Sequence, residues 1–225
     1  MDNKPLRTVR SFAKRSGRIS DSQRQALQTL GKIHCLPYCK ETTNLHTLFS
    51  NENPVVIEIG FGNGDTLVQM AKNNPEINYL GMEVYTAGVG RTLLAIEEFN
   101  LTNLKLVEHD AVEVLNEMIV NSSITGFQIF FPDPWHKTKH HKRRLIQPEF
   151  VKLIIQKLTP NGFIHCATDW ENYAEQMLDV LSSNSDINNR FDGYALRPEN
   201  RPLTKFERRG EKLNHGVWDL IFEKV

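Results

Sequence analysis

The fold is decided by the stretch Val55-Val56-Ile57-Glu58-Ile59-Gly60-Phe61-Gly62-Asn63-Gly64-Asp65. Its first half is an almost continuous apolar run, which is typical of a strand buried on both faces of a parallel sheet. Its second half is a glycine-rich turn, after which apolar residues recur at helical spacing from residue 66 to residue 71. Strand, glycine turn and helix together are the opening unit of a doubly wound α/β fold.

The spacing of the glycines indicates which cofactor the turn suits. Gly60, Gly62 and Gly64 stand at every second residue, which differs from the Gly-x-Gly-x-x-Gly pattern of dinucleotide sites. Glu58 lies just before the turn, where a carboxylate would repel a pyrophosphate but can accept a hydrogen bond from the ammonium of a methionine moiety. The pattern therefore favours S-adenosylmethionine, and a turn of purely structural meaning is the alternative.

The rest of the chain continues the alternation of strands and helices. Apolar runs predict parallel strands at 78–84, 104–107, 127–131 and 163–167, and two closing strands at 194–197 and 217–223, the last of them antiparallel. Helical spacing predicts helices at 22–34, 86–99, 111–118, 148–158 and 171–181. We therefore expect an α/β fold with a mostly parallel, twisted sheet, one antiparallel C-terminal strand, and helices on both faces.

Acidic residues follow several of these strands. Glu83 comes about 20 residues after the glycines, where a carboxylate can accept hydrogen bonds from ribose hydroxyls. Asp110 is placed to cap a helix and also to meet an adenine amino group, and these two roles are compatible. Asp169 is placed at the same edge, with helix capping as its alternative role. Because ligands of open parallel sheets bind outside the carboxyl ends of the strands, we expect these residues to share one rim.

The stretch 128–144 adds a further carboxylate to this rim, followed by a run of bases. Asp133 lies between Pro132 and Pro134 at the end of an apolar strand. Proline fixes φ and restricts the residue before it, so the two prolines hold the carboxylate in an extended corner. A proline-rich turn followed by a solvated basic loop is the alternative interpretation.

The charges are strongly segregated along the chain. The 27 basic and 27 acidic residues cancel, but residues 1–24, 136–144 and 197–212 carry net charges of +5, +5 and +3. The remainder of the chain therefore carries −13. Such segregation indicates a positive face for an extended polyanion.

Composition also sets expectations about compartment and organisation. No apolar run approaches the roughly 20 residues of a membrane span, and no apolar segment follows the basic N-terminus, so we expect a soluble, cytoplasmic protein without a membrane partner. The three cysteines form no Cys-x-x-Cys pair, so we expect reduced thiols and no metal. Residues 1–50 are interpreted as a basic extension, partly disordered, with a mobile arm at 1–24, and residues 51–225 as the main domain.

Several motifs together resemble the successive signatures of bacterial tRNA (guanine-N7-)-methyltransferases, which are class I, Rossmann-like enzymes. The similarity runs from about residue 53 to the C-terminus, and its most specific parts are the Pro-Asp-Pro-Trp corner and the Thr-Lys-Phe-Glu loop. Small departures are Tyr85, in place of a common histidine, and Asn63 inside the glycine turn. The motifs are Ile57-Glu58-Ile59-Gly60-Phe61-Gly62-x-Gly64, Gly81-x-Glu83-Val84, His109-Asp110-Ala111, Phe131-Pro132-Asp133-Pro134-Trp135-x-Lys137, Thr168-Asp169-Trp170-Glu171 and Arg201-Pro202-x-Thr204-Lys205-Phe206-Glu207.

The resemblance implies a role for each matching position. It implies that S-adenosylmethionine donates a methyl group to nitrogen 7 of a guanine in tRNA, guanosine 46 of the variable loop, and that Asp133 is the catalytic residue. The residues implied to bind the cofactor are Glu58, Gly60, Gly62, Gly64, Glu83, Asp110 and Asp133. Those implied to hold the guanosine are Lys137, Asp169, Thr204, Lys205, Phe206 and Glu207. Those implied to contact RNA are Lys139, His140, His141, Lys142, Arg143 and Arg144.

The residue types suit this chemistry, and the alternatives can be distinguished. Nitrogen 7 of guanine has an in-plane lone pair, so Asp133 need only orient the base and stabilise its developing positive charge. Trp135 and Phe206 are the candidates for stacking on the base, with core packing as the alternative. A small-molecule methyltransferase would not need three basic segments, and a non-catalytic RNA-binding module would not bind the cofactor. As for assembly, we expect a monomer or a weak homodimer.

Overall fold

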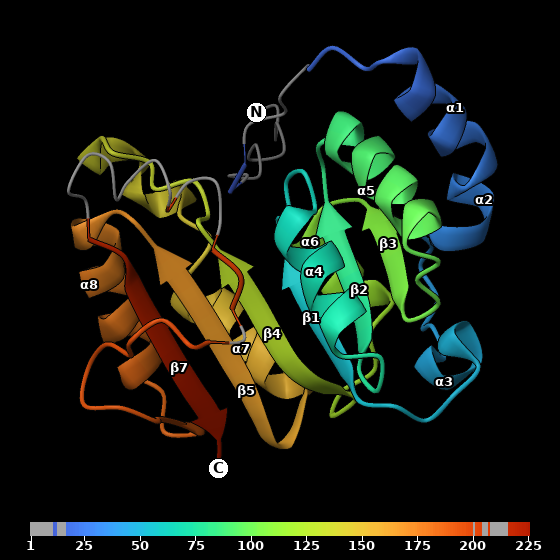
Figure 1. Cartoon of the computed structure of the whole chain (residues 1–225). Coiled ribbons are helices and arrows are strands. Elements are labelled where there is room, and N and C mark those ends of the chain that lie inside the picture. The colour runs from blue at the N-terminus through green and yellow to red at the C-terminus, as the bar shows by residue number, and fades with distance from the viewer. Residues whose placement is uncertain (1–10, 13–16, 200, 204–206, 208–215) are drawn as a thin grey trace, which may run out of the picture.

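A computed structural model describes residues 11–12, 17–199, 201–203, 207 and 216–225, and its centre is a twisted sheet (Figure 1). Within these residues seven strands pair in the order β3-β2-β1-β4-β5-β7-β6. Strands β1 to β5 are parallel to one another, and β7 is antiparallel to both of its neighbours. The predicted fold class is confirmed. The strands are β1 Val55–Ile59, β2 Asn78–Glu83, β3 Leu104–Glu108, β4 Ile124–Phe130, β5 Leu158–Thr168, β6 Ile187–Asn189 and β7 Trp218–Lys224.

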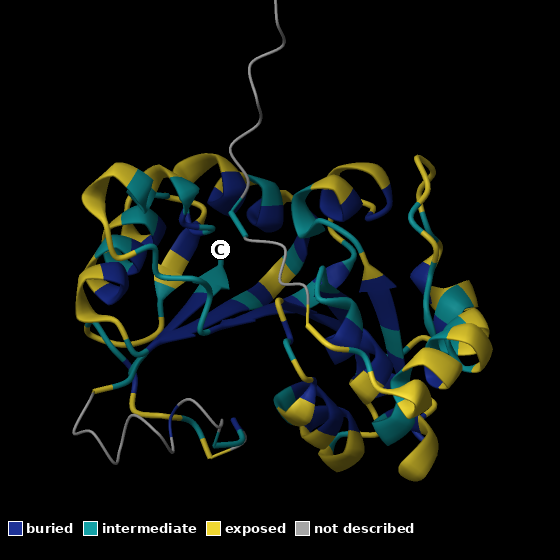
Figure 2. Cartoon of the chain, turned by 90° about the horizontal axis from the view of Figure 1, so that it is seen from above, coloured by how far each residue is buried: buried dark blue, intermediate teal, exposed yellow. Residues whose placement is uncertain are grey.

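Helices cover both faces of the sheet, and their outward faces are exposed while the strands are buried (Figure 2). On one face the packed helices are α1 (Asp21–Thr29), α4 (Asp65–Asn73) and α5 (Thr86–Glu98). On the other face they are α3 (Leu45–Phe49), α6 (Ala111–Glu117), α7 (Pro148–Lys157) and α8 (Glu171–Ser182). The short helix α2 (Gly31–His34) follows α1, and the 3-10 helix η1 (Thr138–Arg143) follows β4.

Strand β1 shows why the apolar run of the sequence produces this arrangement. All five of its residues are buried. Val55, Ile57 and Ile59 pack into the core on one side of the sheet, and Val56 packs into the core on the other side. A strand at the centre of a sheet covered on both faces needs apolar side chains in both directions, so Glu58 at its fourth position is an exception that calls for a functional explanation.

The glycine turn and helix α5 approach each other closely. A Cβ atom on Gly88 would lie only 1.9 Å from the carbonyl oxygen of Gly62, so any larger residue there would displace the turn. This contact places the start of α5 directly against the turn that follows β1.

The predicted strand at 194–197 is wrong. The only pairing of those residues with the sheet is an isolated bridge between Ala195 and Asp219, and the edge strand is β6 at Ile187–Asn189 instead. The apolar residues of the predicted strand are too few to specify a register, and Pro198 ends the segment.

Other differences concern the bounds of elements. Strand β5 begins at Leu158, before Pro160-Asn161-Gly162, because those residues form a bulge with a positive φ of 60° at Asn161 instead of ending the helix before a strand. The predicted helix at 22–34 is divided between α1 and α2. Helix α3 lies in a polar stretch for which no helix was predicted, and Asn44 caps it by accepting a hydrogen bond from the Thr47 N–H.

The segment from residue 17 to residue 50 packs on the main body from α1 onwards. Ser20 and Gln23 form a capping box at the start of α1, and Ala26 is buried against the α4–α5 face. Helix α1 therefore begins inside the stretch predicted as a mobile arm, and Figure 1 shows it lying alongside α5. Residues 1–10 and 13–16 of that arm lie outside the described residues. In the described part of the chain, we find no helix with the length and apolar character needed to cross a membrane.

Candidate active site

The glycine turn after β1 adopts a backbone conformation that requires glycine. Gly60, Gly62 and Gly64 have φ angles of 76°, 58° and 77°, a region that other residues rarely adopt. A Cβ on Gly60 or Gly62 would meet no atom within 4 Å, so backbone conformation and not crowding requires glycine there. At both positions the bare backbone can approach a bound molecule closely.

A cavity opens at the carboxyl edge of the sheet above this turn. Six of the seven residues predicted to bind the cofactor line it, whereas Gly64, the N-cap of α4, does not. Ser11 and Phe12 of the N-terminal segment also line the cavity, a contribution that the sequence pattern did not indicate. The six predicted residues are Glu58, Gly60, Gly62, Glu83, Asp110 and Asp133.

Glu83 is held in place by backbone donors. The Gly62 N–H donates to Glu83 Oε2 at 2.7 Å, and the N–H groups of Val84 and Tyr85 donate to Oε1 at 2.6 and 3.0 Å. A carboxylate offers about four lone-pair positions, so three donors leave one position for a further partner. Glu83 thus fastens the glycine turn to the end of β2 and can still accept from a ligand hydroxyl.

Glu58 brings a buried carboxyl group to the wall of the cavity. The residue is only 3% exposed, and its Oε2 has no hydrogen-bond partner. Burial, together with the nearby charge of Glu83, raises the pKa of Glu58 to about 8. Gln128 lies opposite it on β4, and its Oε1 is also buried without a partner. A buried carboxyl at a cavity wall without a donor is suited to a cationic group of a ligand.

Asp110 caps a helix, as expected, and also lines the cavity. Its Oδ1 accepts a hydrogen bond from the Val112 N–H at 2.9 Å, which makes it the N-cap of α6. The same half-buried side chain lines the cavity.

The corner that carries Asp133 is bracketed by two residues with unusual backbone conformations. Phe131 and Trp135 have φ angles of 52° and 47°, which place both in the left-handed region. Such conformations cost about 1–3 kcal/mol each in non-glycine residues and persist only when the surroundings enforce them. Asp133 is half-buried and lines the cavity beside Phe131 and Pro132.

Arg144 binds the Asp133 corner from inside the protein. It is therefore not part of the predicted RNA-contacting surface. The residue is 2% exposed and its Nε donates to the Pro134 carbonyl at 2.9 Å. Its other nitrogens contact Asn172 and Gln176 of α8, and its guanidinium lies over the ring of Tyr173. All of these contacts are inside the protein, so we assign Arg144 a structural role instead of the predicted RNA contact.

The remaining basic residues after the corner differ in exposure. Lys137, Lys139 and Lys142 are exposed, whereas His140, His141 and Arg143 are half-buried. Partial burial and the neighbouring cations lower the pKa of His140, so it adds no charge at neutral pH. The available positive charge of η1 therefore comes mainly from its lysines.

Trp135 and Arg143 pack on each other and on the N-terminal segment. The Arg143 guanidinium lies 3.6 Å from the centre of the Trp135 ring. Trp135 Nε1 donates to the Ser11 carbonyl at 3.0 Å, and Arg143 contacts the Phe12 carbonyl. One face of the Trp135 ring is therefore covered, which weighs against its predicted role of stacking on a base.

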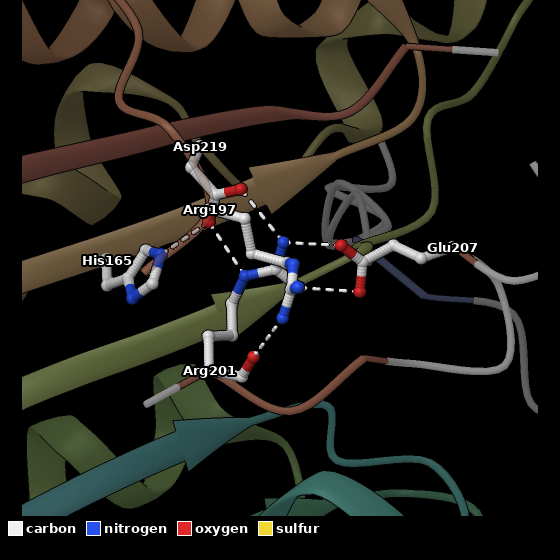
Figure 3. A network of polar contacts seen from close by, with 5 residues as sticks. All are labelled: His165, Arg197, Arg201, Glu207 and Asp219. Atoms are coloured by element: carbon white, nitrogen blue, oxygen red, sulfur yellow. Dashed lines mark hydrogen bonds and ion pairs between the residues drawn. The ribbon is translucent and has the colours of Figure 1, made fainter. Parts of the chain in front are cut away.

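A buried network of charged residues covers the sheet next to this corner (Figure 3). Arg201 is 1% exposed and makes paired hydrogen bonds with two carboxylates, to Asp219 at 2.8 and 2.9 Å and to Glu207 at 2.7 and 2.5 Å. His165 Nε2 lies 2.6 Å from Asp219 Oδ1, and Arg197 donates to the Arg201 carbonyl. The guanidinium also lies near the rings of Phe130 and Phe131 at the end of β4.

This network gives Glu207 a role that the sequence pattern did not reveal. Both of its carboxylate oxygens bind Arg201, and the residue is 2% exposed, so we assign Glu207 a structural role instead of the predicted contact to guanosine. Burial alone would raise the pKa of Asp219, but hydrogen bonds from His165 and Arg201 lower it, so Asp219 is a carboxylate. The signal in the sequence that could have indicated the His165–Asp219 pair is the presence of a histidine and an aspartate inside two apolar strands.

Of the other residues predicted to hold the guanosine, two follow strand ends at the same edge of the sheet and three lie outside the described residues. Asp169 follows β5 and is half-buried, and the N-cap of α8 is Trp170, so Asp169 does not cap that helix. Lys137 follows the corner. Neither lines the cavity. Thr204, Lys205 and Phe206 lie outside the described residues.

The sequence is similar to known methyltransferases over nearly its whole length. A protein-family model described as "Putative methyltransferase" matches residues 52–220. The tRNA (guanine-N(7)-)-methyltransferase of Haemophilus influenzae strain PittGG is 54% identical over 225 residues, which cover 99% of this chain and 92% of that protein. The protein of the same name from Paraburkholderia xenovorans is 52% identical over 218 residues, covering 97% of this chain and 84% of the relative.

Solved structures share the fold at much lower sequence identity. The 16S rRNA methyltransferase KamB superposes with a TM-score of 0.60 at 15% identity, over 82% of this chain and 94% of the other. TrmN from Thermus thermophilus superposes with a TM-score of 0.53 at 15% identity, over 80% of this chain and 47% of the other. These likenesses show the fold alone.

The raised pKa of Glu58 predicts a dependence of stability on pH. Between its ordinary value of 4.5 and about 8 the folded state binds a proton that the unfolded state has lost. The free energy of unfolding therefore falls as pH rises through this window, by up to roughly 1.4 kcal/mol per pH unit. Glu58→Gln should remove this part of the slope when urea unfolding is compared at pH 6 and pH 7.5. The exposed Glu98→Gln should keep it, and equal slopes for wild type and Glu58→Gln would contradict the assignment.

The Arg201 network predicts a large loss of stability on breaking it. Arg201→Met leaves two buried carboxylates without their partner, which should lower the free energy of unfolding by about 3–5 kcal/mol in urea denaturation. The control is Glu223→Gln, which breaks the more exposed pair with Arg190 on the same sheet and should cost less than about 1 kcal/mol. If Arg201→Met lowers the free energy of unfolding no more than this control does, the network does not stabilise the fold.

Proposed function

The chain belongs to the tRNA (guanine-N(7)-)-methyltransferase family, and we propose that it transfers the methyl group of S-adenosylmethionine to nitrogen 7 of a guanine in tRNA. The observation that carries this proposal is the convergence of Glu58, Glu83, Asp110 and Asp133 on one cavity. Identity above 50% over nearly the whole chain supports the same activity. We further propose guanosine 46 of the variable loop as the target.

The cavity suits S-adenosylmethionine. The buried Glu58 oxygen without a donor fits the ammonium of the methionine moiety, and the open lone-pair position of Glu83 fits a ribose hydroxyl. Asp110 at the end of β3 fits the adenine amino group. When bound, the cofactor supplies a methyl group on a positively charged sulfur, which is an electrophile. The glycine turn lets backbone atoms approach it without interference from a Cβ.

Asp133 acts in this proposal by position and charge. Nitrogen 7 of guanine carries an in-plane lone pair, so the attack needs no prior deprotonation. The corner holds the Asp133 carboxylate where it can orient the base and stabilise the positive charge that develops on the ring. A general base of matched pKa is therefore not required.

Several residues around the cavity are proposed to hold the guanosine. Asp169 can accept from N1–H and the exocyclic amine of the base, and Lys137 can contact the adjoining phosphate. Thr204, Lys205 and Phe206 are proposed as further contacts to the guanosine, and Arg201 and Glu207, which lie on either side of them in the sequence, bind each other. We therefore propose that Glu207 binds Arg201 and does not contact the guanosine.

The exposed lysines of η1 are proposed to bind the tRNA backbone. Lys139 and Lys142 lie on the same short helix that follows the corner, and no acidic residue occurs between Asp133 and Glu149. Contacts of this kind give affinity and orientation but do not read base identity.

The role of Asp133 predicts a loss of methyl transfer without a loss of fold. Asp133→Ala should lower the rate with tRNA and labelled S-adenosylmethionine by at least about 100-fold, because it removes the charge that orients and stabilises the reacting base. Its thermal unfolding should resemble that of wild type. The exposed Asp179→Asn on α8 is the control and should keep full activity. Full activity of Asp133→Ala would exclude it as the catalytic residue.

The proposed tRNA surface predicts a change in salt dependence. Lys139→Ala combined with Lys142→Ala should weaken tRNA binding and reduce the magnitude of the slope of log K against log salt by roughly 1.5–2, because two phosphate contacts are lost. Lys72→Ala combined with Lys152→Ala removes the same charge from exposed positions elsewhere and should leave the slope unchanged. Equal slopes for both double variants would remove η1 from the interface.

A further inference from the structure

Trp170 and His136 form an exposed aromatic pair beside the proposed active site. Trp170 is 37% exposed, and His136 is also exposed. Their ring centres lie 4.2 Å apart with an angle of 70° between the planes, so they meet edge to face. A large aromatic side chain that remains open to solvent at a functional rim requires an explanation, because burial would have been favourable.

The two residues come from neighbouring strands at the same edge of the sheet. The Phe131 N–H donates to the Ala167 carbonyl at 2.8 Å, so β4 and β5 are still paired where they end. Trp170 follows β5 by two residues and is the N-cap of α8, and His136 follows the Asp133 corner. The aromatic pair therefore joins the corner that carries Asp133 to the segment that carries Asp169.

The charges around the pair differ on its two sides. Trp170 stands between Asp169 and Glu171, and carboxylates repel phosphate but can accept from the edge of a base. His136 is followed by the exposed Lys137 and Lys139, which suit phosphates. An aromatic ring beside exposed cations is the arrangement by which proteins bind unpaired nucleotides.

Two other aromatic side chains among the described residues, Trp135 and Phe99, are less suited to stacking. Trp135 is covered by Arg143 and bound to Ser11. Phe99 is 39% exposed but lies under Lys72 on the far side of α4 and α5, in a separate groove. Among the described residues of this rim, Trp170 is the exposed aromatic.

We propose that Trp170, with His136 against its ring, is a stacking platform for an unpaired nucleobase of the tRNA at the mouth of the active site. This inference rests on the proposed function and adds a substrate contact to it. The base is either the target guanine or its neighbour in the loop, and both are recognised by the same stacking chemistry.

The test compares Trp170→Ala, Trp170→Phe and a matched control in the full chain. Trp170→Ala should weaken binding of an unmodified tRNA transcript by about tenfold or more and raise KM for tRNA, because stacking on one base is lost. Trp170→Phe should retain most of the affinity. The control Phe191→Ala removes an aromatic that is 48% exposed and should bind as wild type. All variants should bind S-adenosylmethionine and unfold thermally as wild type does.

Tryptophan fluorescence shows whether Trp170 stacks on the target guanine or on the neighbouring base. The chain has three tryptophans, and tRNA should quench a component of wild-type emission that is missing in Trp170→Phe. Quenching of the same component by guanosine monophosphate assigns the target guanine to Trp170, and quenching by tRNA alone assigns the neighbouring base.

The inference is overturned if Trp170→Ala binds tRNA as wild type does, if Phe191→Ala loses as much affinity, or if Trp170→Phe keeps the full quench. Failure of the proposed function itself would be distinct, since wild type would then not methylate tRNA.

Discussion

The site depends on how the Asp133 corner is fixed in space. Phe131 and Trp135 both adopt left-handed backbone conformations, at a cost of about 1–3 kcal/mol each. Two hydrogen bonds between the corner and the rest of the protein oppose this cost: the Phe131 N–H donates to the Ala167 carbonyl, and Arg144 donates to the Pro134 carbonyl. Because Arg144 is itself bound to α8, the position of the carboxylate is coupled to the packing of that helix on the sheet.

The buried charged residues of this molecule differ in whether their hydrogen bonds are satisfied. Arg201, Asp219 and Glu207 satisfy one another with paired hydrogen bonds, and the result is a structural anchor. Glu58 has no such partner, so burial raises its pKa and leaves one oxygen without a donor. A satisfied network stabilises the fold, whereas an unsatisfied buried carboxyl beside a cavity is a position where a ligand can supply the missing donor.

Much of the fold could be predicted from the sequence, since the long apolar runs and glycine turn specify strands, helices and their order. The convergence of Glu58, Glu83, Asp110 and Asp133 on one cavity could be predicted as well, because strand ends of a parallel sheet meet at one edge. The edge strand could not, since three residues at Ile187–Asn189 carry too weak a pattern. The sequence also could not predict which residues of the basic run are exposed. Arg144 and Lys142 have similar neighbours in sequence, but only the packing against α8 buries the arginine.

The central claim is that the strand-end carboxylates place a guanine nitrogen 7 of tRNA against the methyl group of S-adenosylmethionine. The most direct test is to incubate the protein with unmodified tRNA and methyl-labelled S-adenosylmethionine, and then to digest the tRNA and separate its nucleosides. The account predicts label in 7-methylguanosine alone, located at guanosine 46 of the variable loop. Label in a different methylated nucleoside, or no label in tRNA while a small molecule is methylated, would contradict it.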